Sequence, residues 1–170
     1  MKQTLGEMPP EERREKSALI AARFLSSPEY AAARVVFFYR STSEEVDTTR
    51  LIGQALLDGK RVLLPRIQGE KMELVPFYAG DPTQKNQFGI EEPVGKASDE
   101  APDLAVVPLV AFDRARRRLG RGKGFYDRFL RGFSGMSVAL AFCCQECDNV
   151  PADGLDVSPE VILTEKERLQ

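Results

Sequence analysis

The sequence predicts an α/β fold, with residues 1–170 forming one domain in which helices flank a mostly parallel, Rossmann-like sheet as a three-layer sandwich. Two observations support this fold class. Short, continuous runs of β-forming apolar residues recur along the chain, as is typical of strands covered on both faces. Helical apolar patterns separate these runs, and such alternation is typical of parallel sheets. A length of 170 residues suits one domain with a sizeable core.

The first element is a helix that begins near Pro10, where two glutamates follow in the first turn. It carries an apolar stripe and ends at the Ser-Ser-Pro sequence of residues 26–28. Val35–Tyr39 is then a buried strand, and a polar loop from Arg40 to Glu45 follows it.

A second helix starts after Asp47 or Thr48, either of which can cap it, and Gly59 ends it. Arg61–Leu64 is the next strand, which we expect Pro65 to close. The first half is therefore predicted to be a βαβ unit with an additional helix in front.

The second half continues the alternation. Residues 72–78 predict a strand or hairpin arm, whereas residues 80–101 are rich in glycine, proline and charge and predict a long loop, a kind of segment that is usually functional. The remaining predicted elements are strands at 103–107, 137–142 and 161–163, a helix at 125–130 and a loop at 148–159. The loops at 40–45, 111–124 and 148–159 all follow strands, so we expect them to share the ligand-binding face at the carboxyl ends of the sheet.

The most distinctive segment is AFDRARRRLGRGKGFYDRFL, residues 111–130. Gly120, Gly122 and Gly124 alternate in it with Arg121 and Lys123. Glycine lets backbone N–H groups approach an anion, and Arg and Lys add positive charge. The pattern matches neither a Walker A loop nor the dinucleotide fingerprint. It favours phosphate binding, and the alternative is a basic surface turn.

Acidic and aromatic residues near these loops leave alternatives open. Asp127 is either a magnesium ligand, with Asp153 or Asp156 as a second carboxylate, or a first-turn helix acid. Glu45 and Asp47 are either helix N-terminal acids or acceptors for donors of a heterocycle. Tyr126 is either a core aromatic or a stacking group in a site.

Composition excludes several functions. The net charge of −2 argues against a general nucleic-acid binder. Apolar runs are too short to span a bilayer and no signal-peptide core is present, so we expect a cytoplasmic protein without membrane association. The chain has no histidine, which excludes Ser-His-Asp and Cys-His catalysis.

The cysteines Cys143, Cys144 and Cys147 are odd in number and clustered, so they predict neither a disulfide framework nor a zinc site. We expect Cys143 and Cys144 to be buried thiols at the end of a strand.

Residues Arg118–Leu130, RLGRGKGFYDRFL, resemble the signature of the 5-formyltetrahydrofolate cyclo-ligase (5,10-methenyltetrahydrofolate synthetase) family. The resemblance extends along most of the chain, through Pro10–Arg13, Glu45–Thr48, Phe88–Pro93, Val107–Asp113, Gln145, Pro151, Asp156 and Ile162–Thr164. It implies a ligase that uses ATP and Mg²⁺ to convert 5-formyltetrahydrofolate to 5,10-methenyltetrahydrofolate, releasing ADP and phosphate after the formyl oxygen is phosphorylated. Such chemistry needs positioning and charge neutralisation more than a side-chain nucleophile, so it suits a chain without histidine.

The resemblance also implies roles for individual residues. The ATP phosphates would lie against Gly120, Arg121, Gly122, Lys123, Gly124, Phe125 and Tyr126, with catalysis by Lys123, Tyr126 and Arg118. The reduced formyl folate would contact Glu45, Arg40 and Tyr126, and Asp127 and Asp156 would bind the metal. Arg114, Arg116 and Arg117 lie outside the matched part of the signature, and we expect them to be mostly solvated.

The sequence departs from the family pattern at several positions. Leu109 and Arg116 stand where the family has glycine, Leu155 stands where it often has histidine, and Lys2 offers no clear match to a family Lys/Arg pair that contacts ATP. The alternative function is therefore a catalytically impaired folate- or nucleotide-binding protein on the same fold. In either case we expect a monomer or weak homodimer.

Overall fold

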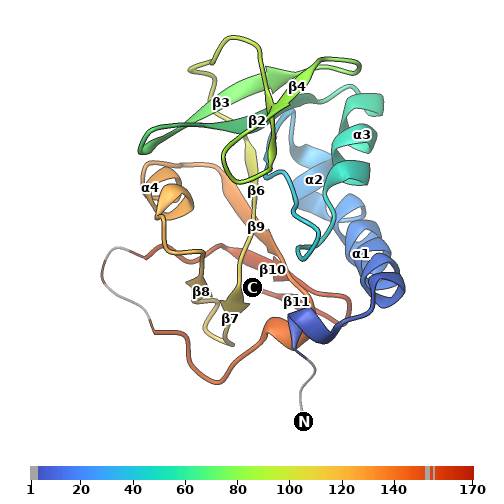
Figure 1. Cartoon of the computed structure of the whole chain (residues 1–170). Helices are drawn as coiled ribbons and strands as arrows, with labels where there is room; N and C mark the ends of the chain where they lie inside the picture. Colours follow the sequence, from blue (N-terminus) through green and yellow to red (C-terminus); the bar gives the residue numbers. More distant parts are fainter. Residues whose placement is uncertain (1–3, 152–153, 155) are drawn as a thin grey trace.

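The computed structural model describes residues 4–151, 154 and 156–170, and its centre is one mixed sheet of seven strands (Figure 1). Five central strands are parallel, and the strand at each edge runs antiparallel to its neighbour. In spatial order the strands are β11 (Arg168–Leu169), β10 (Val161–Leu163), β9 (Met136–Leu140), β6 (Leu104–Val107), β1 (Val35–Phe38), β2 (Arg61–Gln68) and β3 (Lys71–Phe77). The predicted α/β class with a mostly parallel sheet is confirmed.

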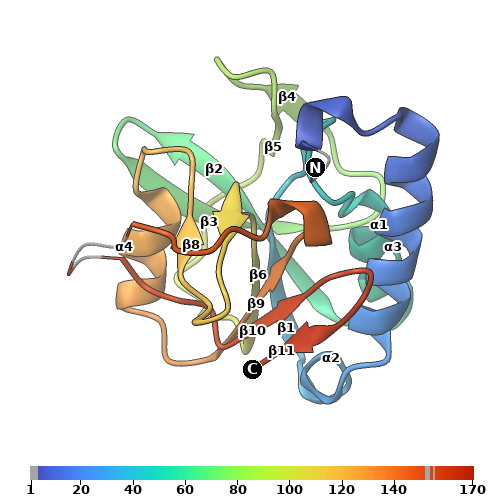
Figure 2. The ribbon, with the colours of Figure 1, turned by 90° about the horizontal axis from the view of Figure 1, so that it is seen from below.

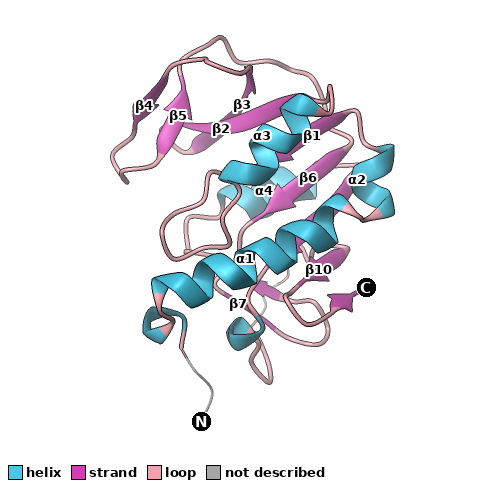
Figure 3. Cartoon of the chain, turned by 90° about the vertical axis from the view of Figure 1, so that its right-hand side faces the viewer, coloured by secondary structure: helices cyan, strands magenta, loops and turns pink. Residues whose placement is uncertain are grey.

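Helices cover the two faces unequally. Three lie on one face, namely α1 (Pro10–Leu25), α2 (Pro28–Ala32) and α3 (Thr49–Leu57), whereas α4 (Phe125–Arg131) lies on the other (Figures 2 and 3). Two single 3₁₀ turns, η1 (Leu5–Glu7) and η2 (Cys143–Gln145), complete the helical elements of the described chain.

The strand β1 shows why these sequences form central strands. Val36 and Phe38 belong to the core cluster beneath α1, α2 and α3, whereas Phe37 packs on the opposite face with Leu130 of α4. All three side chains are fully buried. Both faces of the strand are thus apolar, which produces the continuous hydrophobic runs seen in the sequence.

The predicted helix boundaries largely agree with the structure. α1 ends at Leu25 with Ser26 as its C-cap. The Ser27 hydroxyl then accepts a hydrogen bond from the Tyr30 N–H to cap α2, a short helix that the sequence pattern did not predict. At α3 the cap is supplied by Asp47, whose carboxylate accepts from the Thr49 N–H at 2.8 Å. Gly59 follows α3 with a positive φ of 79°.

The expectation that Pro65 closes the second strand is wrong. β2 continues through Pro65 to Gln68, paired with β3 as an antiparallel hairpin. The β1 ladder on the other side of β2 extends only as far as Leu63. Pro65 therefore lies where β2 has a partner on one side only, and a missing N–H is tolerated there.

The expectation of a structureless loop over residues 80–101 is also wrong in part. This segment contains a two-stranded ribbon of β4 (Thr83–Lys85) and β5 (Glu91–Pro93), and residues 111–119 contain a second ribbon of β7 (Ala111–Phe112) and β8 (Arg118–Leu119). Strands of two or three mostly polar residues carry too little periodicity to be recognised in a sequence. The same holds for β11.

The cysteines are less buried than expected. Cys143, Cys144 and Cys147 are free thiols with intermediate exposure, because Cys143 and Cys144 belong to the η2 turn and not to β9, which ends at Leu140. Among the described residues, no group of three or more His, Cys, Asp or Glu side chains is arranged to bind a metal.

Candidate active site

A cavity of about 600 Å³ opens at the carboxyl ends of β1 and β6. From β1 the chain continues to β2 on one side and later returns to β6 on the other, so this edge is the topological switch point where α/β sheets bind ligands. Tyr39 and Arg40, which follow β1, and Pro108 and Leu109, which follow β6, all line the cavity.

The structure brings to this cavity every residue to which the family resemblance assigns a role. These residues are Arg40, Glu45, Arg118, Gly120, Arg121, Gly122, Lys123, Gly124, Phe125, Tyr126, Asp127 and Asp156. The prediction that the loops after three strands share one face is therefore confirmed for the described residues. Asp153 and Leu155, together with Lys2, lie outside the described residues.

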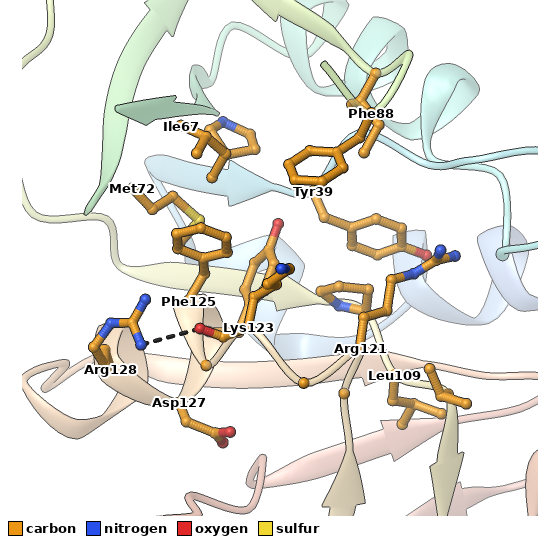
Figure 4. Close-up of a pocket in the computed structure, with 18 of the residues that line it drawn as sticks. Tyr39, Ile67, Met72, Phe88, Leu109, Arg121, Lys123, Phe125, Asp127 and Arg128 are labelled. Atoms are coloured by element: carbon orange, nitrogen blue, oxygen red, sulfur yellow. Dashed lines mark hydrogen bonds between the residues drawn. The ribbon is translucent and has the colours of Figure 1, made fainter. Parts of the chain in front are cut away.

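The glycine loop, residues 120–124, forms one wall of the cavity (Figure 4). Gly122 and Gly124 have φ values of 90° and 73°, a region that side chains disfavour, so glycine is strongly favoured at both positions. Figure 4 shows Arg121, Lys123 and Phe125 rising from this loop, whereas Asp127 lies on its other side. The loop thus presents two cations to the cavity.

Arg118 lies beneath the loop, and its side chain is only 2% exposed. Its guanidinium donates to the Pro108 carbonyl at 3.0 Å and to the Asp127 carboxylate at 3.1 Å, whereas its buried Nε has no partner among the described residues. A Cβ on Gly120 would lie 3.1 Å from this guanidinium, so the loop crosses it closely. Arg118 is therefore held in place under the loop.

Asp127 and Asp156 provide carboxylates at this end of the cavity. Asp127 is partly buried and also accepts from the Val157 N–H at 3.3 Å, which ties α4 to the segment that contains Asp156. A pair of carboxylates is a donor set that suits Mg²⁺, since Mg²⁺ is usually bound by one or two carboxylates together with substrate phosphates and water.

Glu45 reaches the glycine loop from the opposite side. Its Oε1 accepts from the Thr42 N–H at 2.8 Å, and its Oε2 lies 4.0 Å from the guanidinium of Arg121. Arg121 also donates to the Thr42 hydroxyl at 3.3 Å. Of the two acids that the sequence left open, Asp47 caps α3 and Glu45 faces the cavity.

Tyr126 combines both roles that the sequence left open, because it packs against both core clusters and also lines the cavity. Its ring stacks on Phe37 of β1 at a centroid distance of 6.2 Å. Burial, and after it the nearby Glu45 carboxylate, raises the pKa of Tyr126, so the hydroxyl stays protonated. It can therefore donate a hydrogen bond within the cavity at neutral pH.

Arg40 lines the cavity near the β4–β5 ribbon. Its guanidinium lies 5.5 Å from the centre of the Phe77 ring and 4.0 Å from the Glu91 carboxylate, and its buried Nε has no partner among the described residues. Arg40 therefore has a buried donor without an acceptor in the described part of the chain, at the edge of the cavity.

Sequence reasoning missed the opposite wall of the cavity. Ile67 and Met72 of the β2–β3 hairpin and Phe88 and Ile90 between β4 and β5 supply an apolar surface there. The length of the 80–101 segment indicated a functional role, but no pattern in the sequence indicated that the hairpin would fold over the glycine loop.

The expectation that the first three arginines of the basic segment are mostly solvated is confirmed for Arg114, which is exposed, whereas Arg116 and Arg117 are only half-exposed. Arg114 pairs with Glu146 and Glu167, and Arg117 pairs with the buried Asp113. Arg116 donates to the carbonyls of Pro159 and Glu160. These arginines join the β7–β8 ribbon to the C-terminal third of the chain, since each finds an acceptor that is distant in sequence or buried.

Arg116 has a φ of 62°, the one positive value among the described non-glycine residues. A left-handed conformation explains why glycine is the usual residue of the resembled family at this position. Its hydrogen bonds to two carbonyls offset the strain of placing a side chain there.

Known proteins match this chain along most of its length. Residues 1–165 match the model of the 5-formyltetrahydrofolate cyclo-ligase family. The chain is 37% identical to the Haemophilus influenzae 5-formyltetrahydrofolate cyclo-ligase over 139 residues, covering 76% of this chain and 74% of that protein. It is 33% identical to the Escherichia coli K12 enzyme of the same name, covering 91% of both chains.

Solved structures show the same fold. The Aquifex aeolicus 5,10-methenyltetrahydrofolate synthetase is 33% identical, with a TM-score of 0.85 over 96% of this chain and 84% of that one. A 5,10-methenyltetrahydrofolate synthetase from Mycoplasma pneumoniae shares the fold at a TM-score of 0.72, with 19% identity over 93% of this chain and 90% of that one.

Proposed function

The chain belongs to the 5-formyltetrahydrofolate cyclo-ligase family, and we propose that it uses ATP to cyclise 5-formyltetrahydrofolate to 5,10-methenyltetrahydrofolate in the cavity between the glycine loop and the β2–β3 hairpin. The observation that carries the proposal is the meeting of Glu45 and Arg121 in one cavity. An acid suited to heterocycle N–H groups and a cation suited to phosphate are thereby placed next to each other, as a two-substrate reaction requires.

The first step is transfer of the γ-phosphoryl group from ATP to the formyl oxygen, with ADP as the leaving group. Backbone N–H groups of the glycine loop, together with Arg121 and Lys123, neutralise the phosphate charges. Lys123 is exposed in the cavity, so its ammonium can follow the transferred group. Arg118, fixed under the loop, contributes positive charge from a constant position.

In the second step N10 of the folate attacks the activated formyl carbon, and phosphate leaves as the five-membered ring closes. Glu45 and Arg40 orient the folate by accepting and donating hydrogen bonds, respectively. The Tyr126 hydroxyl, kept protonated by burial, donates where the two substrates meet. The apolar wall that includes Met72 and Phe88 excludes water from the activated carbon.

Asp127 and Asp156 are proposed to hold Mg²⁺ beside the phosphates. When bound, the ion supplies charge neutralisation on the phosphate oxygens. The role of the protein is to place the two carboxylates, and the Arg118 and Val157 contacts fix the Asp127 side chain for this purpose.

The described chain contains no helix that is both long and apolar enough to cross a membrane. We further propose that the protein acts in the cytoplasm as a monomer or weak homodimer. Its three free thiols suit a reducing compartment.

The direct test is to mix the purified protein with ATP, Mg²⁺ and 5-formyltetrahydrofolate and to follow the absorbance of the methenyl product. We expect product only when all three are present, with one ADP formed per methenyl group. A folded protein that binds folate by calorimetry but forms no ADP would instead support a binding protein without turnover. ATP hydrolysis that does not depend on folate would contradict both functions.

A further inference from the structure

We propose that Arg128 is a positioning residue that fixes the glycine loop against the tip of the β2–β3 hairpin and so sets the place of Lys123. The inference rests on the proposed function, because it takes Lys123 to be a phosphate-binding residue. Arg128 is outside the set of residues that the sequence indicated for the site, although it lines the same cavity.

The two terminal nitrogens of Arg128 are engaged by two different segments. Nη1 donates to the Lys123 carbonyl at 3.0 Å (Figure 4). Nη2 donates to the carbonyl of Glu70 at 2.9 Å, in the turn between β2 and β3. The guanidinium also lies 5.2 Å from the centre of the Phe125 ring. A planar fork with separate donors can bridge two carbonyls in this way, whereas the single ammonium of lysine is poorly suited to it.

The loop is built to fit this side chain. A Cβ on Gly124 would lie 2.7 Å from Nη1 of Arg128, closer than real contacts allow. Gly124 also has a positive φ of 73°. The absence of a side chain at residue 124 therefore serves two purposes, since it permits the turn and leaves room for the guanidinium.

The hairpin is the anchor of this connection and the loop is the part that is positioned. β2 and β3 are paired along seven residues of each strand, so the hairpin is held without Arg128. The glycine loop has no such ladder, and its backbone turns twice through positive φ. Loss of Arg128 should therefore release Lys123 from its position and leave the folate-side wall in place.

The test compares Arg128→Ala and Arg128→Lys with wild type and with Arg50→Ala, a matched control at an exposed arginine of α3 outside the cavity. The methenyl assay is run with ATP and with folate varied separately, and the melting temperature of each variant is measured. We expect the KM for ATP to rise about tenfold in Arg128→Ala, as for the loss of one charge-assisted hydrogen bond. The KM for folate and the melting temperature should stay near wild type, and Arg128→Lys should restore part of the ATP effect.

A double-mutant cycle with Gly124→Ala adds a second readout. Removing the guanidinium removes the contact that a Cβ at residue 124 would make. Gly124→Ala should therefore raise the KM for ATP by a smaller factor in the Arg128→Ala background than in wild type. Purely additive effects would contradict the packing argument.

The outcomes separate this inference from the proposed function. An inactive wild type with intact folding would refute the proposed function. An active wild type that Lys123→Ala impairs, with an unchanged KM for ATP in Arg128→Ala, would overturn the positioning role alone. Equal losses for both substrates together with a lower melting temperature would also overturn it, because they would indicate a general structural role.

Discussion

The guanidinium of Arg118 donates to the carboxylate of Asp127 at 3.1 Å, directly beneath the glycine loop. The arginine is almost fully buried and the aspartate is 18% exposed, so the carboxylate keeps one side toward the cavity. The same carboxylate oxygen, Oδ1, also accepts from the Val157 N–H. Oδ1 of Asp127 is thus used for structure, and Oδ2 is the oxygen that the proposed metal ion would use.

Replacing Asp127 with asparagine should separate these two roles. The amide oxygen can still accept from Arg118 and Val157, so the fold should be retained, but the negative charge is lost. We expect the Mg²⁺ concentration for half-maximal rate to rise by about tenfold or more. Arg118→Met is the matched variant, and removing one partner of this buried pair should cost about 3 kcal/mol of unfolding free energy. Titration of the rate with Mg²⁺ and urea unfolding give the two values, and an unchanged Mg²⁺ requirement in Asp127→Asn would exclude the metal role.

Replacing Lys123 with alanine tests whether its ammonium binds the phosphates of ATP. Its side chain is exposed in the cavity, so Lys123→Ala should leave stability within about 0.5 kcal/mol of wild type. Loss of a charge-assisted contact to phosphate should raise the KM for ATP by about tenfold or more and change the KM for folate little. Lys123→Arg should restore part of the loss because the charge returns. Equal effects on both substrates would argue against phosphate binding by Lys123.

Sequence patterns predicted the central strands well because each is buried on both faces, and a strand such as β1 must then be apolar throughout. They failed where a few backbone hydrogen bonds decide the structure, as in the β4–β5 and β7–β8 ribbons. Pro65 shows a related limit, since whether a proline ends a strand depends on which neighbouring strands are present.

The candidate site also has a part that the sequence predicts and a part that it does not. The glycine loop is contiguous in sequence and could be recognised from its composition, whereas the wall opposite depends on how the β2–β3 hairpin packs. Met72 and Ile67 therefore carry no local signal of their place in the cavity. The contacts of Arg116 and Arg117 also have no local signal, because their acceptors, Pro159, Glu160 and Asp113, are set by tertiary packing or by a tight turn.

Asp113 gives a prediction for the pH dependence of stability. Its carboxylate accepts from the N–H groups of Ala115, Arg117 and Val150 and from the Arg117 guanidinium. Burial by itself raises the pKa of a carboxyl, but the Val150 and Arg117 donors outweigh it and lower the pKa of Asp113. A carboxyl with a depressed pKa stabilises the fold above its unfolded value of about 3.9, and this stabilisation is lost as the pH falls through the folded value.

Asp113→Asn should therefore lower the unfolding free energy by about 2 kcal/mol at pH 7, since a charged acceptor becomes neutral. The difference from wild type should shrink as the pH is lowered below about 4. Urea unfolding at several pH values measures it, and Asp99→Asn, at an exposed position, is the control with an expected change below about 0.5 kcal/mol. A difference that is independent of pH would show that the charge of Asp113 contributes nothing.

Two glycines outside the site test the packing of the sheet. A Cβ on Gly135 would lie 2.6 Å from the Asp103 carbonyl oxygen and 2.6 Å from the Phe133 ring. The Asp103 backbone cannot move away easily, because its N–H donates to Val35 and its carbonyl accepts from Met136 at the start of β9. Gly135→Ala should therefore lower the unfolding free energy by about 1–3 kcal/mol through overpacking.

The matched control is Gly53→Ala in α3, where a Cβ would meet no atom within 4 Å. Alanine has the higher helix propensity and restricts the unfolded chain, so this variant should be more stable by about 0.5–1 kcal/mol. Urea unfolding of both variants measures the two changes in unfolding free energy. If replacing any glycine with alanine were harmful to this fold, both variants would be destabilised. Stabilisation at residue 53 with destabilisation at residue 135 is expected only if the backbone of Asp103, just before β6, approaches Gly135 as closely as the structure indicates.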